Sequence, residues 1–227
     1  MEFSLHRQLK ELYAGPEARL EDRLDNYRID VVLPGGLVEI QLGPLALLRR
    51  KAARLLESHN LLIVKPVVIG KQIVRLGKPE GPVLSRRRSP KRGEAWEFFH
   101  DLLHFCKVFP HPRLRIHVPL VEIEEIRYPG PNHRWGRRGY RVADQRLLAV
   151  RERIELRRGR DLLHLLPMRP DGPFHARDLA DSLGVTHGVA QRIAYCLYRC
   201  GVARRTAKTK KGYVYVWCRD AVVQRAA

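Results

Sequence analysis

The chain has 227 residues, and 43 Lys and Arg residues against 24 Asp and Glu residues give it a formal net charge of +19 at pH 7. This length suffices for one large hydrophobic core or two small ones. The excess of positive charge favours a polyanionic partner, and nucleic acid is the commonest polyanion. The alternative is an arginine-rich surface that is simply solvated.

The sequence predicts neither a membrane span nor a disulfide scaffold. No apolar run approaches the length of a membrane helix, and the first residues lack the pattern of a secretion signal, so we expect a cytoplasmic protein with no membrane partner. The cysteines have neither zinc-knuckle spacing nor the density of a disulfide scaffold. Two of them, Cys196 and Cys200, stand one helical turn apart and are expected to pack on one helix face.

The first 69 residues alternate between helical and strand patterns. A leucine stripe predicts a helix over residues 4–14, which Ser4 can cap, and alternation predicts a strand over residues 18–24. Residues 27–41 are two short apolar strands around Pro34-Gly35-Gly36, which indicates a hairpin. A helix over residues 45–58 and a buried strand of the parallel type over residues 61–69 follow.

The predicted hairpin brings two carboxylates together. A turn at Pro34–Gly36 folds Asp30 back beside Glu39 across the strand pair, among apolar neighbours such as Val31 and Ile40. Adjacent like charges in an apolar sheet are costly unless a positive charge lies between them. A divalent cation is the simplest such charge. The structural alternative is that each acid pairs with a nearby arginine, Asp30 with Arg28 or Arg23 for example.

This order of elements, with Asp30 followed by Glu39-Ile40-Gln41, resembles the core of the PD-(D/E)XK nuclease superfamily, the fold of restriction endonucleases. That family has an acid at the second strand and an acid-x-Lys motif on the third. The resemblance implies an α/β fold with a restriction-endonuclease-like αβββαβ core, and a Mg²⁺ (or Mn²⁺) cofactor. It also implies that Asp30, Glu39 and the main-chain carbonyl of Ile40 bind the metal.

Gln41 stands where the family usually has lysine, so the positive charge must come from elsewhere. Gln41 itself can orient the attacking water or a phosphate oxygen, but an amide carries no charge. Lys65 is the preferred substitute because a lysine in an apolar strand needs a partner, and Lys51 is the alternative. Many family members place an additional acid on the first helix. Here Glu11 is the candidate for that acid, with Glu17 as the alternative.

The stretch from residue 70 to residue 139 is predicted to complete a first domain, residues 1–139. Strand patterns cover residues 71–76 and 113–128, and an amphipathic pattern predicts a helix over residues 94–108. Residues 79–93 are rich in Pro, Gly and Arg and are predicted to be a basic loop. The Gly- and Pro-rich residues 129–139 are predicted to link this domain to the next.

Residues 140–227 are predicted to form a second, small α+β domain. A helix over residues 176–183, a tight turn at Gly184, a helix that begins after Thr186, and a hairpin with a lysine-rich tip resemble a winged helix-turn-helix over residues 160–218. The resemblance implies contacts with base edges or phosphates at the start of the second helix and with phosphates at the hairpin. The residues in question are Thr186, His187, Gln191, Arg192, Arg204, Arg205, Lys208, Lys210 and Lys211.

Together these patterns predict a metal-dependent endonuclease that cleaves DNA, with the winged helix holding the substrate. The protein is expected to act as a homodimer or within a larger nucleic-acid-processing complex, if not alone. A rival from another class is a DNA-binding protein or regulator without catalysis, built on a decayed nuclease fold. A third alternative is an adaptor whose winged helix binds protein.

Overall fold

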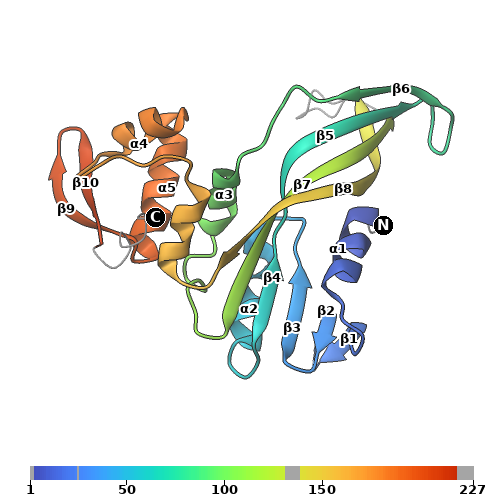
Figure 1. Ribbon diagram of the computed structural model, residues 1–227, viewed down its shortest axis with the longest axis horizontal. Coiled ribbons are helices and arrows are strands. Elements are labelled where there is room, and N and C mark those ends of the chain that lie inside the picture. The colour runs from blue at the N-terminus through green and yellow to red at the C-terminus, as the bar shows by residue number, and fades with distance from the viewer. Residues whose placement is uncertain (1–2, 25, 131–138, 219–227) are drawn as a thin grey trace. The chain divides into compact units, whose positions relative to one another are not determined.

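The protein has an α/β fold with a large mixed sheet, as seen in the computed structural model, which describes residues 3–24, 26–130 and 139–218 (Figure 1). Eight strands form the main sheet in the order β1-β2-β3-β4-β7-β5-β6, and β8 pairs with β7. These strands are β1 (Arg19–Leu24), β2 (Tyr27–Leu33), β3 (Gly36–Ile40), β4 (Leu61–Val64), β5 (Val67–Leu76), β6 (Val83–Arg88), β7 (Leu114–Pro129) and β8 (Tyr140–Leu156). A separate hairpin consists of β9 (Ala203–Thr209) and β10 (Gly212–Trp217).

The chain divides into two compact units that interleave along the sequence. The first unit comprises residues 1–42, 64–94 and 119–153, and the second comprises residues 43–63, 95–118 and 154–227. The domain boundary at residues 139 and 140 stays a prediction, and residues 131–138 of the predicted linker lie outside the described residues. Tyr140 begins β8, so the main sheet continues beyond that boundary.

The predicted order of helix, three strands, helix and strand is confirmed at the N-terminal end. Helix α1 (Ser4–Tyr13) precedes β1, β2 and β3, and α2 (Leu45–Leu55) precedes β4. The strand predicted over residues 61–69 is divided between β4 and β5, because Pro66 has no N–H to donate to a neighbouring strand. As predicted for this buried stretch, β5 pairs in parallel, with β7 as its partner.

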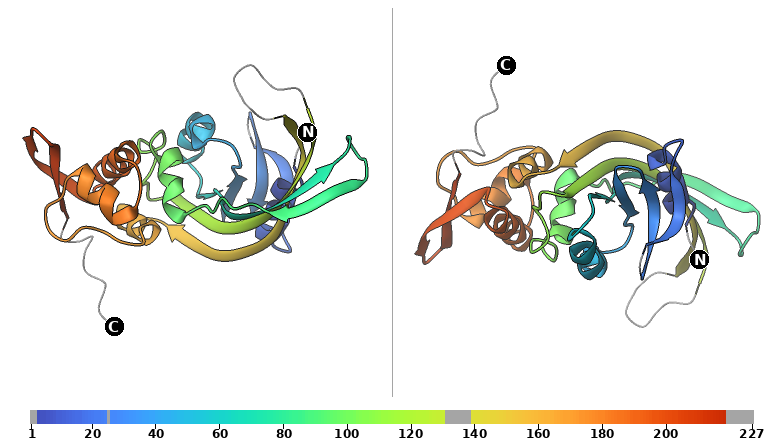
Figure 2. Two further views of the ribbon diagram at one scale, coloured as in Figure 1. Left: turned by 90° about the horizontal axis from the view of Figure 1, so that it is seen from above. Right: turned by 90° about the horizontal axis from the view of Figure 1, so that it is seen from below.

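Two strands differ from the sequence-based expectation. Residues 83–88, predicted as loop, form the edge strand β6, whose six residues are all exposed. The prediction failed because no apolar alternation marks such a strand, and pairing with β5 supplies its order instead. The 17-residue β8 was not predicted either, and only Ile154 and Leu156 along it are buried. Figure 2 shows β7 and β8 side by side.

One predicted helix is shorter than expected, and a further short helix is of the tighter 3₁₀ type. The helix predicted over residues 94–108 is a 3₁₀ turn, η1 (Ala95–Glu97), followed by α3 (Phe98–Leu102), and turns continue beyond it. Aromatic residues are weak helix formers, yet Phe98, Phe99 and Phe105 of this stretch are buried in the second unit. Residues 159–165 form a 3₁₀ helix, η2 (Gly159–Leu165).

The C-terminal elements follow the predicted succession. Helix α4 (Ala176–Leu183) ends at Gly184, which adopts the left-handed conformation (φ 63°) that glycine tolerates best. Thr186 is the N-cap of α5 (His187–Arg199), which packs against α3, α4 and β9. Cys196 on α5 and Cys200 at the C-cap of this helix are both buried, as expected for two residues that pack on one helix face. Among the described residues no helix is long and apolar enough to cross a membrane.

Candidate active site

The β2–β3 hairpin places the two predicted acids at the point where its main-chain pairing ends. The strands are antiparallel, with Val31 opposite Val38 and Leu33 opposite Gly36. Continuing this register by one residue sets Asp30 against Glu39. There the Ile40 N–H donates a hydrogen bond of 2.8 Å to Oδ2 of Asp30, in place of a main-chain acceptor.

The Asp30 carboxylate is held in its ionised form by its neighbours. Burial acts to raise its pKa, but hydrogen bonds from His6 and from the Ile40 N–H outweigh burial, and the charges of His6 and Lys10 add to them. The pKa of Asp30 is therefore lowered below its ordinary value. Only 21% of this side chain is exposed. A partly buried, ionised carboxylate is suited to bind a cation.

Helix α1 contributes two residues to this cluster that the sequence analysis missed. Nε2 of His6 lies 2.9 Å from the Ile40 carbonyl oxygen and 3.5 Å from Oδ2 of Asp30. Lys10, one helical turn along, is buried, forms an ion pair with Glu21, and acts electrostatically on Asp30. The i, i+4 spacing of two basic residues on a helix with a leucine stripe was the available signal. It does not show which strand the helix packs against.

Glu39 lies on β3, and Gln41 and Lys65 directly follow β3 and β4. Glu39 is buried, with a relative exposure of 5%, and the Gln41 N–H donates a hydrogen bond of 2.9 Å to the Val64 carbonyl. Lys65 is also buried, and its Nζ donates a hydrogen bond of 3.2 Å to the Leu42 carbonyl. The predicted substitute lysine is thus in the same unit as the acids.

Of the other predicted members of the site, two are exposed glutamates and one lysine belongs to the second unit. Glu11 is on the exposed side of α1, where one of its carboxylate oxygens is 3.9 Å from Nε of Arg7. Glu17 is also exposed, in the turn after α1. Lys51 lies on α2, which belongs to the second unit. The interactions of α1 with Asp30 come from His6 and Lys10.

The donor atoms around Asp30 fit a divalent cation in part. Magnesium in proteins binds oxygen atoms at about 2.1 Å in octahedral geometry, so neighbouring ligand atoms are about 3 Å apart. The separations of His6 Nε2 from the Ile40 oxygen and from Asp30 Oδ2, 2.9 and 3.5 Å, are of this size. Among the described residues, however, no three His, Cys, Asp or Glu side chains form a ready-made metal site. Glu39 therefore does not form such a site with His6 and Asp30.

In the second unit, the residues predicted to contact DNA are exposed with one exception. Thr186, His187, Gln191 and Arg192 lie at the exposed start of α5. Arg192 Nη1 is 3.4 Å from Nδ1 of His100. On the β9–β10 hairpin the exposed residues of the predicted set are Arg204, Lys208, Lys210 and Lys211.

Arg205 is the exception, because aromatic rings hold its guanidinium group. Its Cζ atom is 3.9 Å from the ring centre of Tyr213 and 4.3 Å from that of Tyr198, and Tyr215 lies 5.7 Å away. Its Nε is buried and has no hydrogen-bond partner among the described residues. Cation–π contacts of this kind stabilise the hairpin against α5.

The fold is that of an α/β protein with a large mixed sheet, in which helix α1 contacts the β2–β3 hairpin that carries Asp30 and Glu39. The chain belongs to the family described as "Domain of unknown function (DUF8091)", which matches residues 3–157. It is also 31% identical over 216 residues to an "Uncharacterized protein" of Treponema pallidum (strain Nichols). That alignment covers 93% of this chain and 82% of the relative, so the likeness extends into the C-terminal elements. No solved structure matches the chain.

Proposed function

We propose that this protein is a metal-dependent nuclease that hydrolyses phosphodiester bonds of DNA. The observation that carries the proposal is the convergence of the Asp30 carboxylate, the Ile40 carbonyl and the His6 imidazole at the end of the β2–β3 hairpin. The resemblance of the helix and strand order to PD-(D/E)XK nucleases supports it, and so does the net charge of +19. The description of the matching family names no activity, so the family match does not itself support a function.

Each residue has a distinct task in this proposal. Asp30, Glu39 and the Ile40 carbonyl hold the divalent cation, which when bound neutralises charge on the scissile phosphate and makes a water molecule more acidic. His6 adds an imidazole nitrogen, a ligand that favours transition metals, so we expect Mn²⁺ to support the reaction at least as well as Mg²⁺. Gln41 orients the attacking water or a phosphate oxygen by hydrogen bonding.

The positive charge that Gln41 cannot supply is assigned to the buried lysines. Lys65 was the preferred candidate from the sequence, and the electrostatic effect of Lys10 on Asp30 makes Lys10 a second one. Their ammonium groups would offset the negative charge that accumulates on the phosphate. The winged-helix elements, α4, α5 and the β9–β10 hairpin, would hold the DNA through the exposed residues at the start of α5 and on the hairpin.

The decisive experiment is a cleavage assay on duplex, single-stranded and branched DNA with Mg²⁺, Mn²⁺ or EDTA. Asp30→Asn and Glu39→Gln keep the size of each side chain and remove its charge, and we expect cleavage to fall to below about 1% of the wild-type rate. Asp22→Asn is the matched control, because Asp22 pairs with Arg19 on β1. Equal cleavage by all four proteins would reject the proposed site.

A non-catalytic DNA-binding protein is the second candidate. Two observations favour it: Gln41 replaces the usual lysine, and among the described residues no three acidic, histidine or cysteine side chains are grouped for a metal. DNA binding that is independent of divalent cations, with no cleavage of any substrate form, would select this candidate.

A further inference from the structure

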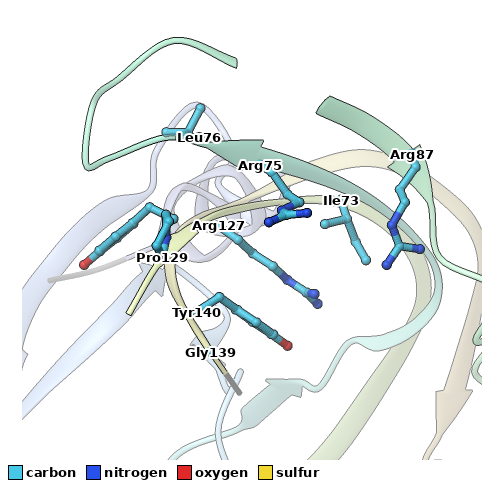
Figure 3. A pocket seen from close by; sticks show the side chains of 9 residues that line it. Ile73, Arg75, Leu76, Arg87, Arg127, Pro129, Gly139 and Tyr140 are labelled. Atoms are coloured by element: carbon cyan, nitrogen blue, oxygen red, sulfur yellow. The ribbon is translucent and has the colours of Figure 1, made fainter. Parts of the chain in front are cut away.

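The first unit contains a cavity of about 330 Å³ that the proposed nuclease site does not use (Figure 3). Strand β5, edge strand β6, the end of β7 and the start of β8 provide its walls. The residues that line it are Ile73, Arg75, Leu76, Arg87, Arg127, Tyr128, Pro129, Gly139 and Tyr140. Three of these nine are arginines and none is acidic.

One of the three guanidinium groups is fixed in place. Arg127 Nε donates a hydrogen bond of 2.6 Å to the buried carboxylate of Glu125. On its other side, the guanidinium carbon of Arg127 lies 3.9 Å from the ring centre of Tyr140. Figure 3 shows the two side chains extended along each other. An arginine held this way loses little side-chain entropy when it binds an anion.

The other two arginines share this face of the sheet and have no counter-charge. Strand pairing sets Arg75 beside Arg127 and Arg87 beside Ile73, and paired residues point to the same side. Within the described parts of the chain, neither Arg75 nor Arg87 has an ion pair or a side-chain hydrogen bond. Glu125 neutralises Arg127, so the charges of Arg75 and Arg87 are the two on this face without an acid, and a bound anion would offset their mutual repulsion.

We propose that this cavity binds a phosphorylated nucleotide, either free or at the end of a nucleic-acid strand. Arginine presents a planar fork of donors that matches phosphate, which explains three arginines where lysine would serve as a point charge. The apolar wall formed by Ile73, Leu76 and Pro129 offers contact for a sugar or base. The volume lies at the lower end of the range for small-molecule sites, so one nucleotide fits and a longer segment does not.

The proposal is independent of the nuclease activity and is tested in EDTA, where no metal-dependent cleavage occurs. Titration calorimetry compares adenosine monophosphate, adenosine and inorganic phosphate on the full chain. We expect the monophosphate to bind at least about tenfold more tightly than either of the others, because the phosphate and the nucleoside each contribute. Fluorescence anisotropy compares a labelled oligonucleotide with and without a 5′-phosphate, which separates the free ligand from the strand end.

The matched variants are Arg75→Gln with Arg87→Gln, and Arg49→Gln with Arg50→Gln as the control. Each double variant removes two exposed positive charges, but only the first alters the cavity. We expect the first to weaken phosphate-dependent binding at least about tenfold and the control to leave it unchanged. Arg75→Lys with Arg87→Lys keeps the charge, and a partial loss in this variant would show that the guanidinium fork matters.

Three results would overturn the proposal. The first is equal binding of adenosine and its monophosphate together with no effect of the 5′-phosphate. The second is phosphate-dependent binding that both double glutamine variants retain. The third is inorganic phosphate binding as tightly as the nucleotide, which would make the cavity an anion site only.

Discussion

Nε2 of His6 lies 2.9 Å from the carbonyl oxygen of Ile40, so the first helix reaches the residue between Glu39 and Gln41. The same nitrogen is 3.5 Å from Oδ2 of Asp30. Without a metal, the imidazole can donate a hydrogen bond to that carbonyl or to the carboxylate. Nε2 could bind a metal only without its proton, so the hydrogen bond it donates here and metal binding exclude each other.

His6→Ala is therefore expected to weaken Mn²⁺ binding by about ten- to hundredfold and to lower metal-dependent cleavage with it. The direct measurement is calorimetric titration with Mn²⁺, which needs no activity. His164→Ala removes an exposed histidine from η2 and serves as the control. Mn²⁺ affinity equal to wild type in both variants would mean that His6 is only a structural partner of Ile40.

Glu125 holds together the charged side chains on one face of β5, β7 and β8. Its side chain is only 4% exposed and accepts hydrogen bonds from Lys71 Nζ and Arg127 Nε, each at 2.6 Å, and from Gln145 Nε2 at 2.9 Å. Burial acts to raise its pKa, but these donors outweigh it and lower the pKa below the ordinary 4.5. Its charged form therefore stabilises the fold.

Glu125→Gln is expected to lower the free energy of unfolding by about 2 to 4 kcal/mol at pH 7, because two cations lose their buried partner. A lowered carboxyl pKa adds stability that is complete above the unfolded-state pKa and is lost as pH falls through the folded-state value. The difference between wild type and variant should thus shrink below about pH 4. Urea unfolding at several pH values measures it, with exposed Glu152→Gln as the control. A difference that does not change with pH would contradict this account.

The parts of the site that local sequence patterns specify could be predicted, and the parts that depend on long-range packing could not. The positions of Asp30 and Glu39 follow from strand alternation and a short turn, both local, and the structure places them as expected. His6 could not be predicted, because its role depends on how α1 packs on β2 and β3, which periodicity does not encode.

The same limit explains what was missed in the sheet. Strand β8 has charged residues on both faces, so the alternation that identifies a half-buried strand is absent. The cavity near Arg127 is built from β5, β6, β7 and β8, and two of these strands were not predicted. Long-range pairing therefore decides the features that sequence patterns left open.

Asp144 caps helix α1 from a distant strand. Its Oδ1 accepts a hydrogen bond of 2.8 Å from the Ser4 N–H, and its Oδ2 accepts one of 2.7 Å from the Ser4 hydroxyl. Ser4 was predicted to be the cap itself, but Phe3 occupies the N-cap position and no side chain caps the helix locally. A carboxylate at this end also complements the helix dipole.

Asp144→Ala is expected to destabilise the protein by about 1 to 2 kcal/mol, and Ser4→Ala by less, because the N–H hydrogen bond survives in the second variant. Thermal or urea unfolding of both variants and their combination gives the coupling between the two residues. Additive effects in the double variant would show that the two side chains do not interact.

Cys106 is expected to be the reactive thiol of the second unit. Hydrogen bonds from the thiols of Cys196 and Cys200 lower the pKa of Cys106, whereas its sulfur and burial raise theirs. The same two thiols lie 3.8 and 3.6 Å from the carbonyl oxygens of Phe99 and Phe109. Cys106 Sγ in turn lies 3.1 Å from the carbonyl oxygen of Leu102, to which its thiol donates when it is protonated.

Iodoacetamide should therefore modify Cys106 in the native protein at pH 6 to 7, while Cys196 and Cys200, which are buried, stay unmodified. Mass spectrometry of peptides after short exposures measures each site. In Cys196→Ala with Cys200→Ala the donors are lost, and the labelling rate of Cys106 should rise with pH over this range. A rate that already rises with pH in the wild type would contradict the lowered pKa.

The lysines of the β9–β10 hairpin offer a test of the DNA-binding role that does not depend on cleavage. Lys208, Lys210 and Lys211 are exposed, and the Lys208 ammonium lies 5.8 Å from the ring centre of Tyr213. The salt dependence of binding is the slope of log Kd against log salt concentration. If each lysine contacts a phosphate of duplex DNA, replacing all three by alanine should lower this slope by about 2 to 3. Fluorescence anisotropy in EDTA at several salt concentrations measures this slope.

The control variant loses three exposed charges elsewhere, at Arg49, Arg50 and Lys78. Its slope should stay closer to wild type, because general electrostatic attraction falls equally in both variants whereas direct phosphate contacts are lost only from the hairpin. Equal slopes for the two triple variants would assign DNA binding to the overall charge. In that case α4, α5 and the β9–β10 hairpin would be available to a protein partner, as the adaptor alternative requires.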